Sequence, residues 1–123
     1  MVKIAIIDYG LGNLRSIRRG LEEVKSEVSV TQKREDVIDA NAIVLPGVGA
    51  FEEAAKNLRP LSEVILDQVQ EGKALLGICL GLQILFTTSA EGGVHRGLDV
   101  FKGEVIKLPP SVKIPHIGWN TLR

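Results

Sequence analysis

The only cysteine of this chain has neighbours that favour a reactive thiol. Cys79 stands between Gly77 and Gly81 as Gly-x-Cys-x-Gly, after an apolar run over residues 74–78 and before a helix-compatible stretch. This order predicts a strand buried on both faces, a tight turn and a helix, which is the thiol version of a nucleophile elbow. Glycine two residues before and after the nucleophile leaves room for a strained turn. We therefore interpret Cys79 as a nucleophile at a helix N-terminus, which favours the thiolate, rather than as a packed apolar residue.

Backbone amides that could stabilise negative charge occur in two places. The amide of Leu80, directly after the cysteine, is expected to point at the reacting centre and to form half of an oxyanion hole. The loop Pro46-Gly47-Val48-Gly49 follows an apolar strand pattern over residues 42–45. In open α/β sheets ligands bind at this end of the strands, and glycines let the backbone approach a ligand and present its amides. The alternative is an ordinary turn.

The first turn of the chain offers a weaker signal. Residues 3–7 read as a central strand, and Tyr9-Gly-Leu-Gly-Asn13 precedes apolar residues at helical spacing over 14–24. A strand, a glycine turn and a helix open a βαβ unit, but the third glycine of the dinucleotide fingerprint is absent. A nucleotide-binding domain that uses Gly10 and Gly12 therefore remains only as an alternative.

The remaining elements must position these loops. The pattern predicts a strand over 28–31, a helix after Phe51, and a second helix that begins at Pro60 and ends before Gly72. Residues 87–97 read as a polar surface loop with a solvated His95, and residues 98–108 as an antiparallel hairpin around Lys102-Gly103. Together these elements predict a single α/β domain with a doubly wound, mostly parallel sheet and a C-terminal antiparallel hairpin.

Composition excludes several classes of function. The 123 residues carry no formal net charge, so the chain lacks the electrostatic footprint of a nucleic-acid or membrane-surface protein. One cysteine excludes an internal disulfide and fits a reducing compartment. With no run of transmembrane length and no signal-peptide pattern, we expect a cytoplasmic protein. The His and Cys residues lack the spacing of metal ligands, and no cofactor is implied.

A tryptophan-containing segment ends the chain. Pro115-His116-Ile117-Gly118-Trp119-Asn120 follows the break at Pro109-Pro110. A tryptophan between proline and glycine is typical both of a core corner and of an interface anchor, and the sequence alone leaves both readings open.

Three motifs together carry a family resemblance that covers the whole chain. They are the elbow Gly77-Ile78-Cys79-Leu80-Gly81-Leu82-Gln83, the Pro46–Gly49 loop and the Pro-His-x-Gly-Trp-Asn motif. The chain resembles class I glutamine amidotransferases, and most closely the glutaminase subunits of imidazole glycerol phosphate synthases in histidine biosynthesis. The anthranilate and carbamoyl-phosphate types are alternatives, but they would be expected to carry histidine where this chain has Leu82.

The resemblance implies a role for each matching position. Cys79 would attack the side-chain amide of glutamine and release ammonia through a thioester. Val48 and Leu80 would offer backbone amides to the oxyanion, and Gly49 and Gln83 would line the glutamine pocket.

The resemblance also implies a protein partner. Pro115, His116, Trp119 and Asn120, together with Asn13, would face a cyclase subunit with a (β/α)8 barrel. The two subunits would form a heterodimer, and ammonia would pass through the barrel to the partner's substrate.

One departure from the family pattern limits the expected activity. The family completes its catalytic triad with His and Glu in a Phe-His-Pro-Glu-like motif, and neither His95 nor His116 matches it. We interpret the chain as a glutaminase domain without its C-terminal part, and expect little or no glutamine turnover by the chain alone. We also expect an exposed sheet edge or apolar patch. A non-catalytic, partner-binding module of the same fold is the alternative.

Overall fold

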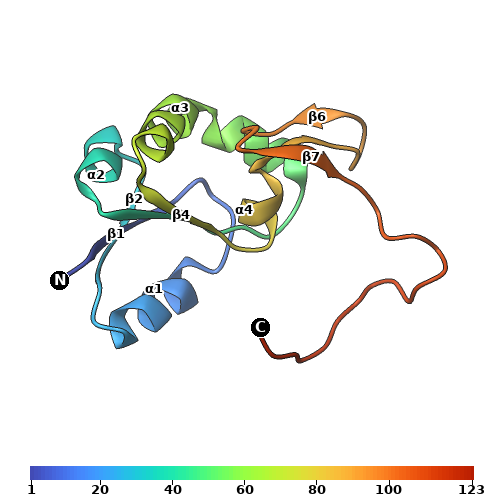
Figure 1. The fold of residues 1–123 in the computed structure, drawn as a ribbon, viewed down its shortest axis with the longest axis horizontal. Coiled ribbons are helices and arrows are strands. Elements are labelled where there is room, and N and C mark those ends of the chain that lie inside the picture. The colour runs from blue at the N-terminus through green and yellow to red at the C-terminus, as the bar shows by residue number, and fades with distance from the viewer.

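A computed structural model describes all residues from 1 to 123 and contains a four-stranded sheet (Figure 1). Its strands are β1 (Lys3–Ile7), β2 (Glu27–Thr31), β3 (Ala42–Leu45) and β4 (Ala74–Gly77). They lie in the order β2-β1-β3-β4 and pair only in parallel, so β1 is a central strand as expected. The short apolar, β-branched runs of β1 and β3 form central strands because they bury their side chains against neighbouring elements, whereas β2 and β4 at the sheet edges bury at most one residue each.

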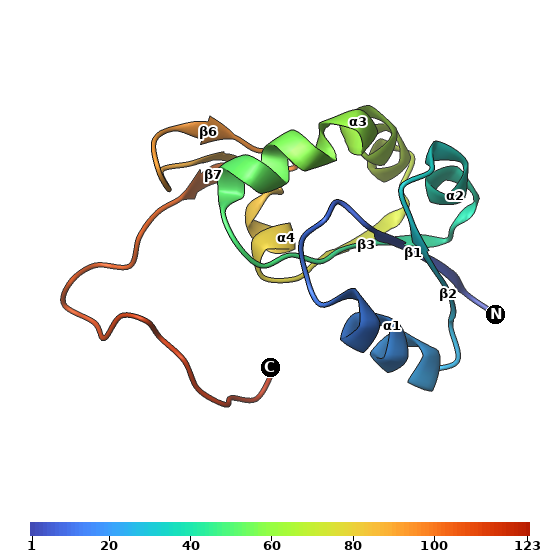
Figure 2. The ribbon, with the colours of Figure 1, turned by 180° about the vertical axis from the view of Figure 1, so that it is seen from behind.

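Helices cover both faces of this sheet. Helix α1 (Leu14–Glu23) lies on one side, and α2 (Arg34–Asp39) and α3 (Phe51–Gln70) lie on the other (Figures 1 and 2). Along β1 the side chains alternate between the faces, because Ile4 and Ile6 pack with the α1 residues while Ile7 joins the α3 side. The doubly wound architecture predicted from the sequence is confirmed.

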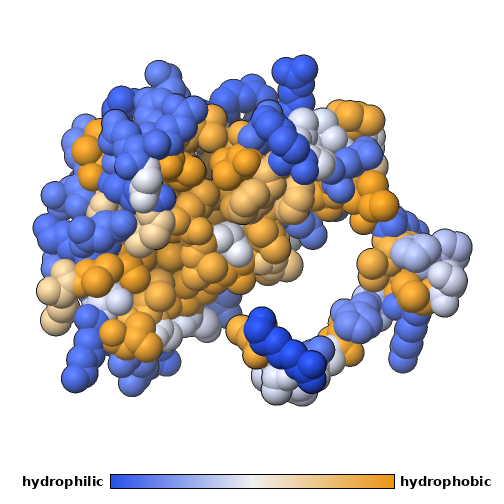
Figure 3. Space-filling model, in the orientation of Figure 1, coloured by the Kyte–Doolittle hydropathy of each residue, from blue (hydrophilic) through white to orange (hydrophobic).

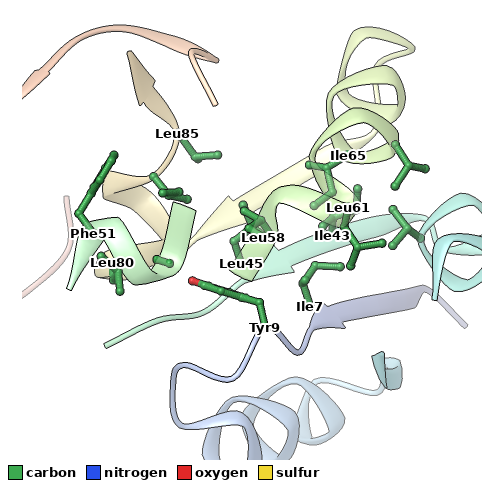
Figure 4. Close-up of a cluster of buried hydrophobic side chains, with 14 residues drawn as sticks. Ile7, Tyr9, Ile43, Leu45, Phe51, Leu58, Leu61, Ile65, Leu80 and Leu85 are labelled. Atoms are coloured by element: carbon green, nitrogen blue, oxygen red, sulfur yellow. The ribbon is translucent and has the colours of Figure 1, made fainter. Parts of the chain in front are cut away.

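The larger core lies between the sheet and α3 (Figure 4). Ile43 and Leu45 of β3 are fully buried there against Phe51 and Ile65 of α3. Burial of a side chain of this size contributes roughly 1.5–3 kcal/mol. This core fixes the C-terminal end of β3, from which the Pro46–Gly49 loop leaves the sheet.

The sequence prediction was wrong about the helices in two places. Instead of a new helix at Pro60, one helix runs through Pro60 from residue 51 to residue 70. A proline inside a helix costs about 3 kcal/mol. The apolar face continues across it through Leu58, Leu61 and Ile65, and this burial offsets the cost. Helix α2 was missed because it has only six residues, of which Val37 alone is buried.

The expected hairpin over 98–108 is also wrong. A second sheet of order β6-β5-β7 is formed by β5 (Phe86–Ser89), β6 (His95–Arg96) and β7 (Phe101–Val105). The antiparallel pair is β5 with β6, within the predicted loop, and β7 pairs in parallel with β5. Gly103, at φ 147°, lies inside β7 where the pairing with β5 shifts register, and its amide donates to the Thr87 hydroxyl instead of forming a hairpin turn.

Strand β4 differs from the expected doubly buried strand. It has one neighbour in the sheet, β3, and is therefore an edge strand. Leu76 of β4 is 52% exposed, and Ile78 and Leu82 beyond it are 36% and 44% exposed. Figure 3 shows apolar surface gathered at the middle of this face, where Figure 1 places β4 and α4 (Leu80–Gln83). The expected exposed sheet edge and apolar patch are confirmed.

The C-terminal segment, residues 106–123, contains no helix or strand, and every residue in it is exposed. In Figure 1 it leaves β7, bends outward and turns back, so that the C-terminus lies below α4 in this view. None of the helices of the protein is both long and apolar enough to cross a membrane.

Candidate functional site

The cysteine occupies a strained corner between β4 and α4. Its backbone has φ 53° and ψ −113°, a conformation that a residue with a side chain rarely adopts. The Cys79 thiol is exposed to solvent. Strain of this kind persists only where the surrounding structure imposes it, and it concentrates at functional sites. The expected strand–turn–helix corner is therefore present, with Cys79 at its tip.

The two glycines of the elbow are required by close backbone contacts. A Cβ atom at Gly81 would lie 1.9 Å from the carbonyl oxygen of Leu45, and one at Gly77 would lie 2.7 Å from the Cα of Leu82. Non-bonded atoms in a folded protein do not come this close to one another. The Gly-x-Cys-x-Gly spacing thus lets β3, β4 and α4 meet beneath Cys79.

The elbow and the Pro46–Gly49 loop lie against each other. The Ile78 amide donates to the Leu45 carbonyl at 2.9 Å, and the Leu80 amide donates to the Gly47 carbonyl at 3.3 Å. Val48 beyond them is 58% exposed. The two motifs that the sequence analysis selected are consequently joined at the C-terminal end of the neighbouring strands β3 and β4.

In this conformation the Leu80 amide is already occupied by the Gly47 carbonyl. Because a trans peptide directs its C=O and N–H in opposite directions, the Val48 amide points away from the Leu80 amide. The Val48 amide makes no hydrogen bond within the chain. A rotation of the Gly47–Val48 peptide would free the Leu80 amide and turn the Val48 amide toward the elbow. Gly47, which has no Cβ, and Gly49, at φ 114°, give this loop the necessary freedom.

The helix that follows the cysteine is shorter than the sequence suggested. Helix α4 has only four residues, Leu80–Gln83, so it provides little of the macrodipole expected to favour a thiolate. Gln83, expected in the glutamine pocket, lies half-buried on this turn of helix. Gly49, its expected counterpart, is exposed at the end of the neighbouring loop.

Sequence reasoning gave no separate role to Tyr9, which lies beneath the Pro46–Gly49 loop. Its side chain is 5% exposed, and its hydroxyl donates to the Pro46 carbonyl. Burial, with a smaller contribution from the Cys79 charge, raises the pKa of Tyr9 to about 12. The Tyr9-Gly-Leu-Gly-Asn13 motif was visible in the sequence, but nothing local in it indicated a contact with Pro46.

The first glycine turn packs on the same loop. A Cβ at Gly12 would lie 3.0 Å from the Gly47 nitrogen. Asn13 accepts a hydrogen bond from the Ser16 amide at 3.4 Å and caps α1. Packing and capping therefore explain the glycine turn at residues 10–13 without any need for a bound nucleotide. The Asn13 side chain remains exposed.

Neither histidine is bonded to the cysteine. His95 lies in β6 instead of a loop, with its Nε2 3.1 Å from the Gly92 carbonyl and 3.7 Å from the Glu52 carboxylate. His116 lies in the exposed C-terminal segment. No hydrogen bond reaches the Cys79 sulfur, and no group of three or more His, Cys, Asp or Glu residues is arranged to hold a metal ion.

The expected partner-facing residues of the C-terminal segment, Pro115, His116, Trp119 and Asn120, are all exposed. Trp119 is fully exposed, so it does not form a core corner in this structure. Its contact-free position is compatible with the interface alternative.

Comparison with known proteins shows the family to which the chain belongs. The model of the family "Glutamine amidotransferase class-I" matches residues 5–122. The chain is 49% identical to the imidazole glycerol phosphate synthase subunit HisH of Methanosarcina acetivorans, and the match covers all of this chain and 61% of the relative. It is 54% identical to the HisH subunit of Aquifex aeolicus, over 98% of this chain and 60% of that relative. The chain thus spans about three fifths of the length of these relatives.

A solved structure shares the fold at low sequence identity. A Listeria monocytogenes protein described as a peptidase E superposes with a TM-score of 0.61 at 14% identity. The superposition covers 71% of this chain and 50% of that one. At this identity the likeness concerns the fold alone.

Proposed function

Because the chain belongs to the class I glutamine amidotransferases, we propose that it is the nucleophile-bearing part of a glutaminase subunit of an imidazole glycerol phosphate synthase. Its substrate is glutamine, and its product is ammonia for a cyclase subunit in histidine biosynthesis. The observation that carries the proposal is the exposed Cys79 thiol at φ 53°, on an elbow whose backbone is hydrogen-bonded to a second loop that bears amides.

The proposed chemistry begins with the Cys79 thiolate. Its sulfur attacks the side-chain amide carbon of glutamine, and the C=O electron pair moves to oxygen to form a tetrahedral oxyanion. The carbon–nitrogen bond then breaks, the departing nitrogen takes up a proton, and ammonia leaves a thioester on Cys79. Water hydrolyses the thioester to glutamate and restores the thiol.

The oxyanion requires hydrogen-bond donors, and in the present conformation of the loop these donors do not point at the reacting carbon. We assign this role to the amides of Val48 and Leu80, which become available together when the Gly47–Val48 peptide rotates. Loss of one such donor typically lowers kcat by a factor of about 100–1000. Glutamine hydrolysis is therefore expected only from the rotated conformation, with Gly49 and Gln83 beside the substrate.

The proton transfers require a base that residues 1–123 do not bring to the sulfur. His95 is engaged with Gly92 and Glu52, and His116 lies in the C-terminal segment. We therefore expect the 123-residue chain by itself to release ammonia from glutamine no faster than its Cys79→Ser variant. Turnover above that background would contradict this assignment of roles.

The partner is proposed to be the cyclase subunit, a (β/α)8 barrel, bound as a heterodimer. In this proposal the docking side chains are the exposed residues Pro115, His116, Trp119 and Asn120 of the C-terminal segment. Asn13, which is also exposed, provides a further contact with the partner. Trp119 is the only tryptophan, so its fluorescence reports docking without a label.

An affinity label for glutamine sites tests the proposal without turnover. We choose a glutamine analogue in which a chloromethyl ketone replaces the side-chain amide. The Cys79 sulfur would add to the ketone carbon, whose oxygen takes up the electron pair where the glutamine oxyanion would form. The sulfur would then move to the neighbouring carbon, where a carbon–sulfur bond forms as the carbon–chlorine bond breaks and the ketone is restored. We expect one label per chain, located on Cys79 by peptide mass spectrometry, with a rate that saturates with reagent and falls when glutamine is added.

The control for this experiment is iodoacetamide, a thiol reagent with no likeness to glutamine's amino-acid end. Iodoacetamide should label Cys79 without saturation, because it does not bind in the glutamine pocket before it reacts. If the chloroketone behaves in the same way as iodoacetamide, there is no glutamine pocket, and the glutaminase proposal is refuted.

A further inference from the structure

The oxyanion loop has a support that comes from a distant part of the chain. Tyr9 follows β1, and its ring lies in the core among Leu45 and Leu80. Figure 4 shows its hydroxyl oxygen directed toward Leu80, beneath the end of β3. The main-chain oxygen of Tyr9 accepts a hydrogen bond from Asn57 of α3 at 3.1 Å, so the residue is held at its backbone as well.

The hydroxyl meets the loop at one peptide. It donates to the Pro46 carbonyl, and a Cβ built at Gly47 would lie only 2.5 Å from the Tyr9 oxygen. Glycine at position 47 thus makes room for the Tyr9 hydroxyl. The next carbonyl along the chain, that of Gly47, accepts from the Leu80 amide. A continuous chain of contacts therefore runs from Tyr9 through Pro46 and Gly47 to the residue after the nucleophile.

These contacts divide the loop into a fixed peptide and a free one. The Pro46–Gly47 peptide is held by Tyr9, whereas the Gly47–Val48 peptide is held only by the 3.3 Å bond from Leu80. Gly47 lies between the two peptides and can change its backbone angles without a side-chain clash at Cβ. If the first peptide also moved, rotation of the second would not direct the Val48 amide to a defined point.

We propose, on the basis of the proposed glutaminase function, that Tyr9 is a positioning residue that anchors the Pro46–Gly47 peptide as the fixed side of a hinge at Gly47. Tyr9 does not touch the substrate and acts through the position of the Val48 amide. The anchor persists through the pH range in which a thiol titrates, since burial raises the pKa of Tyr9 to about 12 and keeps the hydroxyl a donor.

Saturation kinetics of the chloroketone label separate positioning from binding. Tyr9→Phe retains the ring and removes one hydroxyl donor. Because one hydrogen bond contributes about 0.5–1.5 kcal/mol and 1.36 kcal/mol corresponds to tenfold, we expect the maximal labelling rate constant to fall about two- to thirteenfold. The half-saturating reagent concentration should change less than about twofold. The iodoacetamide rate should also stay within about twofold, since that reagent does not depend on the Val48 amide.

Ser62→Ala is the matched control. The Ser62 hydroxyl also donates to a main-chain carbonyl, that of Leu58 at 3.1 Å, but on α3 rather than at the loop. We expect it to retain the fold, because alanine is a stronger helix former than serine, and to leave both labelling constants unchanged. An unchanged maximal rate in Tyr9→Phe, or an equal loss in Ser62→Ala or with iodoacetamide, would overturn the positioning role.

A fluorinated tyrosine keeps the test informative if Tyr9→Phe fails to fold. Tyr9 is the only tyrosine, so 3,5-difluorotyrosine can replace it throughout the chain. Its phenol ionises at lower pH and then no longer donates. The maximal labelling rate, relative to the iodoacetamide rate, should fall as this phenol ionises, and a flat ratio would reject the anchor. If the unmodified chain shows no saturable labelling, the glutaminase proposal itself fails.

Discussion

Two regions of the molecule contain similar apolar residues and treat them in opposite ways. In the sheet region Ile43 is fully buried, whereas in the C-terminal segment Ile117 is 86% exposed. The sheet region gives most of its apolar side chains a partner surface from a neighbouring strand or helix, with edge strand β4 as the exception, where Leu76 is 52% exposed. The C-terminal segment offers the same residue types with no packing surface. Apolar composition therefore does not determine burial in this chain; the presence of a receiving face does.

The contrast has a functional side. The nucleophile elbow is built into the well-packed region, where fixed contacts maintain strain at Cys79. The motif proposed for partner docking lies in the region without contacts, where Trp119 is available to another molecule. Chemistry that needs a defined geometry and recognition that needs exposed anchors are thus assigned to different parts of the chain.

The largest expected effect comes from emptying the core. Ile43→Ala should lower the free energy of unfolding by about 2–5 kcal/mol, since it removes buried methyl groups and leaves a cavity. Ile117→Ala makes the same chemical change in the C-terminal segment and should stay within about 0.5 kcal/mol of the unmodified chain. Urea denaturation followed by circular dichroism measures both. Similar losses in the two variants would mean that the C-terminal segment is packed in solution.

A smaller loss is expected from adding one methyl group beneath the nucleophile. Gly81→Ala would put a Cβ 1.9 Å from the Leu45 carbonyl oxygen, whereas Gly118→Ala meets nothing within 4 Å. Overpacking of this kind costs about 1–3 kcal/mol, so Gly81→Ala should lower stability by that amount. It should also slow labelling of Cys79 by the chloroketone, because β3 must separate from α4. Normal labelling by Gly81→Ala would contradict the close contact that we describe.

The sequence predicted the elements that depend on local patterns. Strands β1 and β3 and helix α1 follow from apolar periodicity, and the glycines around Cys79 were correctly explained by backbone contact. The pairing of β7 with β5 could not be predicted, because it depends on Thr87 bonding to Gly103 across the second sheet.

The residues of the candidate site could be predicted from the sequence, but the hydrogen bonds between its two loops could not. Gly-x-Cys-x-Gly and Pro-Gly-Val-Gly identify the two loops, yet only the structure places the Leu80 amide on the Gly47 carbonyl. The exposed side of β4 was likewise hidden from the sequence, since an apolar run does not say how many neighbours a strand has. Contacts between segments far apart in the chain account for both failures.

The third prediction concerns the pKa of Tyr9, which lies between the core and the Pro46–Gly49 loop. The single tyrosine should titrate with a pKa of about 12, against about 10 in the unfolded chain, when followed by tyrosinate absorbance. Because the folded pKa is the higher one, this group stabilises the fold fully below pH 10 and loses that contribution as pH rises toward 12. The unmodified chain should therefore lose stability more steeply over this window than Tyr9→Phe. A titration near pH 10 would indicate that Tyr9 is exposed in solution.

The smallest effect is expected from removing the unpacked region. Deletion of residues 106–123 takes away seven large apolar side chains that are at least 44% exposed, namely Ile106, Leu108, Val112, Ile114, Ile117, Trp119 and Leu122. Because they bury little surface, the free energy of unfolding should change by less than about 0.5 kcal/mol. Binding to a cyclase subunit, measured by calorimetry, should instead be lost, and Trp119→Ala should weaken it more than Lys113→Ala. Retained binding after the deletion would mean that the docking surface lies on the folded region and that the C-terminal segment has no role in docking. A large loss of stability would mean that the apolar residues of this segment pack against the sheet in solution.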